Sequence, residues 1–466
     1  MTRAEAEALD RADPLADLRS AFDLPEGVIY LDGNSLGPPT KAALARLRQG
    51  AEEEWAKGLI RSWNDAGWID LPHRAGAKIA RLIGAQSGDV VVCDSVSVNL
   101  FKIAAALLAR KPGRALCVAA DEFPTDQYVL EGLSRLTGAP LLRIVAGEVP
   151  EAAVIVRSLV HYKTAAVADM AEAERAAAER GADIIWDLSH ATGAVAIDVS
   201  ANGARFAAGC GYKYLNGGPG APAFLYVRRD AAERLRQPIS GWMGAQAPFD
   251  FSSAYEPADG AARFAAGTPP ILSLSALDAS LDLFDGVDLD ALEAKARALG
   301  DLFLAAGAAA GLQPVAVAGR RGGHVAFRHA DAYAIVQAMI AQGVIGDFRA
   351  PDLARFGFSP LYLSYADVWR AGEILNMART RFRAPFKSHL IPRHRRGDAI
   401  RFGDRRQGVQ RFLQEVQAAR ALAARQRDKS ASDERLIIVG RIGEEARDTV
   451  VGLFERPGRR LAASNL

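Results

Sequence analysis

Short apolar runs alternate with helix-like segments through the first half of this chain, and that alternation limits the folds open to it. Such a pattern predicts a mostly parallel sheet with helices on both faces. In sheets of this kind ligands bind beyond the carboxyl ends of the strands, so we expect functional residues just after the runs. The runs comprise residues 90–93, 114–120, 152–160, 182–190, 204–210 and 221–227.

The second half has a different pattern. From about residue 286, long helix-like segments alternate with single short apolar runs such as residues 322–329. Half of the 466 residues are apolar, which is enough for a large core and two domains. We therefore expect an α/β fold: a large domain with a mostly parallel mixed sheet, followed by a smaller α+β domain.

The positive charge of the chain is concentrated near its end. Residues 385–466 hold 18 Lys and Arg against 10 Asp and Glu, whereas the preceding residues hold 39 against 45. The basic excess therefore says nothing about the main body of the chain. We rank nucleic-acid binding through this segment last among the functions considered, and we predict no nucleic-acid partner.

Cysteine content and the first residues indicate the compartment. The three cysteines have no paired spacing, which argues against a disulfide framework or a zinc site and favours a reducing environment. The first twenty residues are polar, and no apolar run reaches the length that spans a membrane. We expect a soluble, cytoplasmic protein without a membrane partner or a metal.

Lys213 lies in a glycine-rich stretch with aromatic neighbours, "GCGYKYLNGGPGAPAF" (209–224). Glycines there let the backbone turn sharply and let a ligand approach closely. An amine can form an imine with an aldehyde and a guanidinium cannot, and the chain uses only 10 Lys beside 47 Arg. Taken alone, a surface Lys in a turn is the commoner interpretation.

Three polar residues follow other apolar runs. Asp187 ends the run "ADIIW" and could meet a cationic ring nitrogen, although a turn or cap role is commoner. His190, three residues on, could contact the same ligand or be a packed core histidine. Ser97 precedes an apolar helix, where a Ser is usually an N-cap, and the same helix start can bind a phosphate.

Together with the aromatic Phe123 and nearby Asp126, these residues supply what pyridoxal 5′-phosphate needs from a protein: an amine, a carboxylate, a helix start and a ring. The chain also resembles the kynureninase family, pyridoxal-phosphate enzymes of the aminotransferase-like fold (fold type I, class V). The matching stretches run in the family's order over about residues 25–375. They are "YLDGNSLGPP" (30–39), "SVSVNLFK" (95–102), "DEFPTDQYV" (121–129), "WDLSHATGA" (186–194), "GCGYKYLNGGPGAPAFLYV" (209–227), "GWMG" (241–244), "GTPPILSLSALDASL" (267–281) and "RFGFSPLYLSYADVW" (355–369).

The resemblance implies roles for individual residues. Lys213, Tyr212 and Asp187 would be catalytic: Lys213 would bind the cofactor as an imine, and Asp187 would keep its ring nitrogen protonated. Arg355 would hold the substrate α-carboxylate, a role that suits a bidentate guanidinium, and Ser35 would lie near the substrate. Cofactor contacts are implied for Val96, Ser97, Phe123, Pro124, Thr125, Asp126, Ser158, Asp187, His190, Tyr212, Lys213, Trp242 and Thr268.

Two positions depart from the family's pattern. Val96 stands where Thr is common, so a phosphate contact there could involve only the backbone N–H. His161 stands where Asn is more usual. The resemblance also implies a homodimer in which Trp242 and Thr268 reach the neighbouring subunit's site. For the aryl group of a substrate, Trp63, Trp68 and Phe123 are candidates, and simple core packing is an equal alternative.

The activity implied by the resemblance is the hydrolysis of L-kynurenine, and of its 3-hydroxy form, to anthranilate (or 3-hydroxyanthranilate) and L-alanine. This reaction belongs to tryptophan catabolism and NAD biosynthesis. The alternatives are another pyridoxal-phosphate lyase of the same fold, or a protein that binds the cofactor without turnover because its last residues, 385–466, differ from those of the family. Cysteine desulfurases need a mobile nucleophilic Cys in the second half of the chain, and none follows Cys210.

These observations divide the chain into four predicted parts: residues 1–40 as an N-terminal segment, 41–285 as the cofactor-binding domain, 286–384 as the small domain and 385–466 as an atypical basic tail. The resemblance stops near Arg383. The tail could be a surface extension, a basic arm or an out-of-frame end, and the coding DNA would distinguish the last. It holds one amphipathic helix pattern (409–424) and one strand-like run (435–442).

Overall fold

The computed structural model describes residues 1–151, 153–381, 437–441 and 449–453. By their contacts the residues divide into two compact units, 1–385 and 386–466. Within the described ranges, no helix is both long and apolar enough to cross a membrane.

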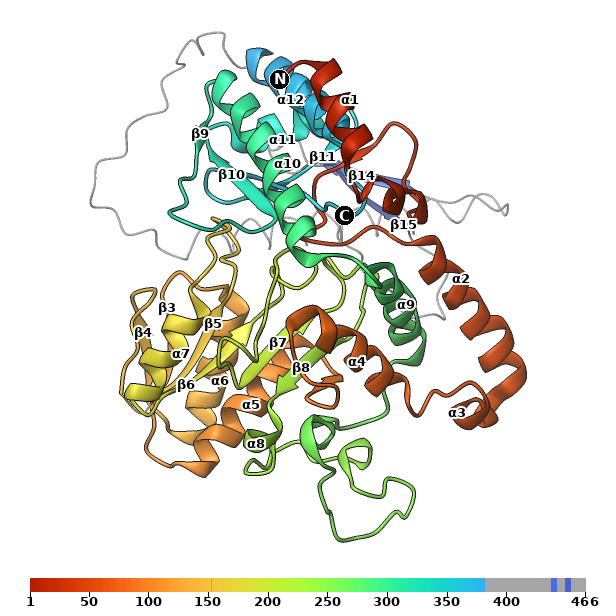
Figure 1. The fold of residues 1–466 in the computed structure, drawn as a ribbon, viewed down its shortest axis with the longest axis vertical. Helices are drawn as coiled ribbons and strands as arrows, with labels where there is room; N and C mark the ends of the chain where they lie inside the picture. Colours follow the sequence, from red (N-terminus) through yellow and green to blue (C-terminus); the bar gives the residue numbers. More distant parts are fainter. Residues whose placement is uncertain (152, 382–436, 442–448, 454–466) are drawn as a thin grey trace, which may run out of the picture. The chain divides into compact units, whose positions relative to one another are not determined.

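A seven-stranded sheet forms the centre of the larger part of the first unit (Figure 1). Its strand order is β2-β8-β7-β6-β5-β3-β4, and every neighbouring pair is parallel except the two pairs made by β8. The predicted mostly parallel mixed sheet is therefore confirmed. The strands are β2 (Val90–Val92), β3 (Leu116–Ala119), β4 (Leu141–Ile144), β5 (Val154–Ser158), β6 (Asp183–Asp187), β7 (Phe206–Cys210) and β8 (Ala223–Val227).

Both faces of this sheet carry a buried core. Successive side chains along a strand point to opposite faces, so neighbouring residues join different cores. On β6, Ile185 joins a core with side chains of α5 (Val96–Arg110) and α6 (Pro124–Thr137). Its neighbours Ile184 and Trp186 join the other core, with α4 (Leu71–Ile83), α7 (Met170–Glu179) and α9 (Ile271–Leu281). Burial on both faces explains why β2, β3, β7 and β8 are continuous apolar runs rather than alternating ones, whereas the edge strand β4 is partly exposed.

A second, antiparallel sheet with strand order β12-β13-β10-β9 lies with three helices at the other end of the first unit (Figure 1). This confirms the expected smaller α+β domain. Its strands are β9 (Gln313–Pro314), β10 (His324–Arg328), β12 (Asp347–Arg349) and β13 (Leu353–Gly357), and its helices are α10 (Leu289–Ala309), α11 (Ala332–Ile340) and α12 (Tyr365–Arg381).

The N-terminal residues are tied to this smaller part of the unit. Strand β1 (Ile29–Tyr30) pairs in parallel with β11 (Val344–Ile345). The Asp10 carboxylate on α1 (Arg3–Ala12) accepts hydrogen bonds from the backbone N–H groups of Tyr365 and Ala366, at 2.6 and 3.0 Å. It thereby caps the start of α12, where backbone donors lack partners within the helix.

Shorter elements complete the first unit. They are η1 (Ala16–Ala21), α2 (Lys41–Gln49), η2 (Gly50–Gly58), η3 (Leu59–Arg61), α3 (Ser62–Asp65), α8 (Arg229–Ala232), η4 (Trp242–Gly244), η5 (Gly260–Phe264) and η6 (Asp282–Phe284).

In the second unit, β14 (Ile437–Arg441) and β15 (Thr449–Leu453) form an antiparallel pair. The strand predicted in residues 435–442 is thus confirmed over 437–441. The helix predicted for 409–424 lies outside the described residues.

Candidate active site

A cavity of about 260 Å³ lies at the carboxyl edge of the large sheet. Ser158, Asp187 and Cys210 are the last residues of the parallel strands β5, β6 and β7, so the sheet brings all three to one edge. Its size is near the lower end of ligand clefts, which suits a small ligand. The residues lining it are Ser95, Val96, Ser97, Phe123, Thr125, Asp126, Ser158, Tyr162, Asp187, Ser189, His190, Cys210, Tyr212, Lys213, Ala221 and Ala223.

The amine of Lys213, which follows β7, lies among three rings. Its Nζ is 3.0 Å from His190 Nε2 and 5.9 Å from the ring centroids of both Phe123 and Tyr212. Burial raises the pKa of Tyr212 above its ordinary value, so that phenol stays protonated at neutral pH. A nucleophilic amine and aromatic faces thus share one small space.

Close backbone packing holds the Lys213 segment in place. A side chain at Gly211 would put Cβ 2.5 Å from the carbonyl oxygen of Pro222, so only glycine fits there. Gly37, in the "GNSLG" loop, donates its N–H to the carbonyl of Tyr212 at 2.8 Å. A Cβ at Gly37 would lie 2.1 Å from the carbonyl oxygen of Lys213. These glycines therefore let two backbone segments of the chain pack closely against each other beside Lys213.

Two buried carboxyl groups line the cavity near Lys213. Asp187 Oδ1 accepts a hydrogen bond from the N–H of Ser189 at 2.8 Å. Burial raises the pKa of Asp187, and the positive Lys213 opposes that rise. Burial and the neighbouring Asp187 hold the pKa of Asp126 well above its ordinary range. A cationic group bound beside them would offset both effects and favour the ionised carboxylates.

His190 is buried and neutral. Burial, and secondarily the positive Lys213, holds its pKa well below the ordinary histidine value. Its Nδ1 has no hydrogen-bond partner in the described part of the chain, although it is buried. The ring of His324 lies 5.4 Å away, centroid to centroid. A buried ring nitrogen without a partner is a ready contact for a polar ligand atom.

Helix α5 starts two residues earlier than an N-cap at Ser97 would imply. The N-cap is Ser95, whose Oγ accepts from the N–H of Val98 at 3.4 Å, and Val96 is the first helical residue. The interpretation of Ser97 as an N-cap is therefore wrong, because the chain turns helical before it. Ser97 and Val96 lie in the first turn, where backbone N–H groups can bind an anion.

Glu122 is a residue that the sequence did not single out. Its buried carboxylate accepts from the N–H of Ser158 (2.9 Å), the hydroxyl of Ser158 (2.6 Å) and the N–H of Phe123 (2.9 Å). It thus joins the end of β5 to the start of α6, on which Pro124 and Thr125 occupy the first turn. No local sequence pattern reveals such a link between residues 36 positions apart.

Arg355 and Ser35 lie together but do not line the cavity. Arg355 Nη2 donates to Ser35 Oγ at 3.0 Å, and Nη1 donates to the carbonyl of Tyr162, a cavity residue, at 2.7 Å. The carboxylate of Asp347 accepts from Arg355, Ser35 and Arg349. The buried guanidinium therefore already holds one carboxylate next to the cavity. Asp347 and Arg349 were not predicted.

Trp242 and Thr268 lie away from the cavity of the single chain. Trp242 is half-buried in η4, 5.8 Å from Trp63 and 5.9 Å from Phe249 between ring centroids, and Thr268 is exposed. Trp63 in turn stacks edge-on with Trp68 at 6.1 Å. Of the three aryl-pocket candidates, Phe123 lines the cavity and the two tryptophans belong to this separate aromatic cluster.

The residues at the cavity fit pyridoxal 5′-phosphate. Lys213 offers an amine to the aldehyde, and the start of α5 offers N–H groups to the phosphate. Asp126 Oδ2 is buried without a hydrogen-bond partner among the described residues, as is Nδ1 of His190. A polar ring ligand in the cavity could supply the hydrogen-bond partners that these two atoms lack. Ser95, Tyr162, Ser189 and Cys210, which were not predicted as site residues, also line the cavity.

Comparison with solved structures shows the fold. A cysteine desulfurase from Escherichia coli superposes with a TM-score of 0.67 at 20% identity, covering 79% of this chain and 98% of that one. A C-DES lyase with glycine covalently linked to its PLP cofactor superposes with a TM-score of 0.68 at 15% identity, covering 77% and 98%. Both superpositions show the fold of this chain, which is the aminotransferase-like α/β fold.

Comparison with related sequences shows the family. A kynureninase of Deinococcus radiodurans is 47% identical over 390 residues, covering 79% of this chain and 94% of that protein. A kynureninase of Pseudomonas fluorescens is 47% identical over 394 residues, covering 80% and 94%. The family model "Kynureninase C-terminal domain" matches residues 292–375. The chain belongs to the kynureninase family.

Proposed function

We infer that the chain is a pyridoxal-phosphate-dependent hydrolase that cleaves a carbon–carbon bond of L-kynurenine. Water and L-kynurenine give anthranilate and L-alanine. The observation that carries this proposal is the meeting of the Lys213 amine, the Asp187 carboxylate and the start of α5 in one cavity of a kynureninase-family chain. When bound, the cofactor supplies an electron sink for negative charge at the substrate's α-carbon.

Lys213 would hold the cofactor's aldehyde group. Once freed by the substrate amine, its Nζ would move the proton at the substrate's α-carbon. The neutral His190, whose Nε2 lies 3.0 Å away, keeps that Nζ directed into the cavity. Asp187 would hold the ring nitrogen in its protonated form, and Phe123 would cover one face of the ring. Tyr212, with its raised pKa, would act as a hydrogen-bond donor.

Arg355 and Ser35 would bind the substrate's α-carboxylate. Because Asp347 already occupies the Arg355 guanidinium, the substrate must share it or displace Asp347. Arg349 lies 2.8 Å from the same Asp347 oxygen and can keep that carboxylate paired when the substrate arrives. A guanidinium suits this exchange because it donates from several N–H groups at once.

We further propose a cytoplasmic homodimer whose subunits share each site. The support is the position of Trp242 and Thr268 outside the cavity of one chain, together with the contact of Trp242 with the exposed ring of Phe249. Phe249 and Phe251 are 53% and 78% exposed, with ring centroids 6.5 Å apart, and Trp55 and Ile60 are 60% and 76% exposed. Neighbouring exposed apolar side chains are typical of interaction surfaces. The three free, buried cysteines suit a reducing compartment.

The second candidate, desulfurase-type thiol chemistry, is disfavoured by the cysteines. Burial raises the pKa of Cys93 to about 12 and that of Cys117 to about 11, and it also raises the pKa of Cys210. None of these buried thiols is the accessible thiolate that such chemistry needs.

The test is to mix purified holoenzyme with L-kynurenine, or its 3-hydroxy form, and to follow anthranilate or 3-hydroxyanthranilate fluorescence. We expect turnover with the wild-type chain and none with Lys213→Ala. No product from a chain with normal cofactor absorbance would instead support a binding protein without turnover. Full activity of Lys213→Ala would refute the role given to Lys213.

A further inference from the structure

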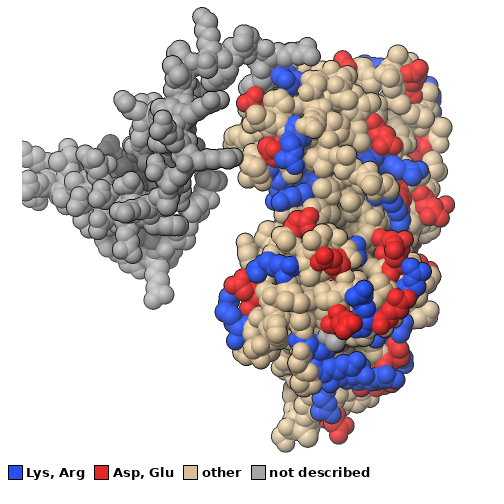
Figure 2. Space-filling view, turned by 90° about the vertical axis from the view of Figure 1, so that its left-hand side faces the viewer, with Lys and Arg blue, Asp and Glu red and all other residues tan. Residues whose placement is uncertain are grey.

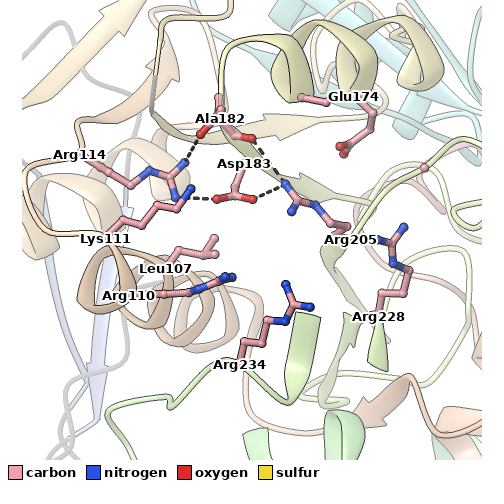
Figure 3. A pocket seen from close by; sticks show the side chains of 13 residues that line it. Leu107, Arg110, Lys111, Arg114, Glu174, Ala182, Asp183, Arg205, Arg228 and Arg234 are labelled. Carbon is pink, nitrogen blue, oxygen red and sulfur yellow. Dashed lines mark hydrogen bonds and ion pairs between the residues drawn. The ribbon is translucent and has the colours of Figure 1, made fainter. Parts of the chain in front are cut away.

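A second cavity, of about 430 Å³, lies at the opposite edge of the large sheet (Figure 3). Arg205 and Asp183 stand at the amino ends of β7 and β6, and Arg114 stands just before β3. Asp187 ends the same strand β6 on the cofactor side. The second cavity is therefore separate from the site described above. It is lined by Leu107, Arg110, Lys111, Arg114, Glu174, Ala178, Gly181, Ala182, Asp183, Gly203, Arg205, Arg228 and Arg234.

Six of the lining residues are cationic and two are acidic. Asp183 lies between Arg114 and Arg205 and accepts from both, with Arg114 Nη1 at 2.5 Å. Arg228 is bound by Asp230 at 2.6 and 2.9 Å. Three of the six cations, Arg114, Arg205 and Arg228, are thus paired with carboxylates. Space-filling shows blue side chains gathered at the lower end of the face drawn in Figure 2.

The other three cations, Arg110, Lys111 and Arg234, have exposed side chains and make no side-chain hydrogen bond or ion pair with the described part of the chain. In Figure 3, Arg110 and Arg234 extend toward one another across the opening. Three like charges at one cavity mouth repel, and an anion bound among them would remove that repulsion.

The second acid does not neutralise this excess. Glu174 Oε1 accepts from Trp186 Nε1 at 2.7 Å and faces the cavity from α7. Burial raises the pKa of the Glu174 carboxyl to about 7, so only part of its charge is present at neutral pH. The net charge of the side chains that line the cavity therefore stays strongly positive.

We propose that this cavity binds a small, multiply charged phosphate compound, of which inorganic pyrophosphate is the simplest. Guanidinium groups pair with phosphate oxygens in bidentate geometry, and Lys adds a point charge. Arg110 and Arg234, on opposite sides of the mouth, can each take one phosphoryl group while Lys111 contacts either. Among the described residues, no aromatic side chain lines the cavity, so a nucleotide's base would find no ring there to stack on.

The test is calorimetric titration of the holoenzyme, whose cofactor phosphate site is filled, with pyrophosphate at constant ionic strength. The pocket variant Arg110→Gln/Lys111→Gln/Arg234→Gln is compared with Arg11→Gln/Arg297→Gln/Arg370→Gln. The control also removes three exposed cations that make no side-chain bond with the described residues. We expect saturable binding to wild type and control, and at least about tenfold weaker binding to the pocket variant.

Equal binding to all three proteins, or no binding to the wild type at about 10 mM pyrophosphate, would overturn the proposal. ADP serves as a second probe: weaker or equal binding compared with pyrophosphate supports a phosphate-only ligand, and much tighter binding refutes it. If the pocket variant does not fold, the single change Arg234→Gln takes its place, with a loss of at least threefold expected. The readout is independent of kynurenine turnover.

Discussion

Replacing Gly37 by Ala probes how the "GNSLG" loop positions the reactive lysine. The new Cβ would lie 2.1 Å from the carbonyl oxygen of Lys213 and 2.4 Å from Asn216 Oδ1. Real Cβ contacts are essentially never below 3.0 Å, so the Lys213 carbonyl must retreat by about 0.9 Å. That carbonyl also accepts from the N–H of Asn216 at 2.9 Å, and therefore the turn must move with it.

Two losses follow from this shift. Overpacking of a tight site costs about 1–3 kcal/mol of unfolding free energy. A displacement near 1 Å in a catalytic group can lower the rate by about 10²-fold. We therefore expect Gly37→Ala to lower both the denaturant midpoint and, by about two orders of magnitude, kcat for anthranilate release.

Gly132→Ala is the matched control. Gly132 lies within α6, and a Cβ there would meet nothing within 4 Å. Because Ala favours helix over Gly by about 0.8–1 kcal/mol, this variant should be slightly more stable and fully active. Guanidinium unfolding by far-UV circular dichroism and the fluorescence assay measure both properties. Wild-type kcat and midpoint in Gly37→Ala would refute the reasoning.

Three further changes have defined outcomes. Glu122→Gln replaces an acceptor of three hydrogen bonds with a group that also donates, so the free energy of unfolding should fall by about 1.5–3 kcal/mol and cofactor binding should weaken. The control, the surface change Glu131→Gln, should cost under about 0.5 kcal/mol. Equal denaturant midpoints for the two variants would contradict this. Arg355→Lys should raise KM by more than about tenfold with a smaller change in kcat, because Lys cannot donate in bidentate fashion; an unchanged KM would argue against a carboxylate clamp. His324→Phe tests a buried base whose pKa burial and Arg355 hold well below the ordinary value. Below about pH 6.5 only the unfolded chain takes up this proton, so the free energy of unfolding of the wild type falls by up to about 1.4 kcal/mol per pH unit as the pH decreases. The variant lacks this loss and should become more stable relative to the wild type as the pH falls from about 7.5 to 5.5. Parallel profiles of unfolding free energy against pH would refute the assignment.

The sequence could predict those parts of the site that depend on strand ends. Asp187 ends one parallel strand and Lys213 closely follows another, so apolar runs and the carboxyl-edge rule were enough to bring these two together. Ser158 ends a neighbouring strand, but only the resemblance implied it as a site residue. The helix start was misjudged by two residues, because the N-cap depends on the backbone conformation at Ser95 rather than on residue type alone.

Other features could not be predicted from the sequence because they depend on long-range pairing. Glu122 reaches Ser158 across 36 positions, and Arg355 meets Ser35 across 320. The carboxylate of Asp347 joins that pair only because β12 and β13 are antiparallel, which places Asp347 opposite Arg355. Neither periodicity nor composition reports such side-chain pairing.

The account depends most directly on a covalent bond between Nζ of Lys213 and the cofactor. Borohydride reduction of the holoenzyme, followed by digestion and mass spectrometry, would make that bond permanent and locate it among the 10 lysines of the chain. The account predicts the reduced cofactor on the peptide that contains Lys213. Its presence on another lysine, or an unmodified Lys213 peptide, would contradict the account.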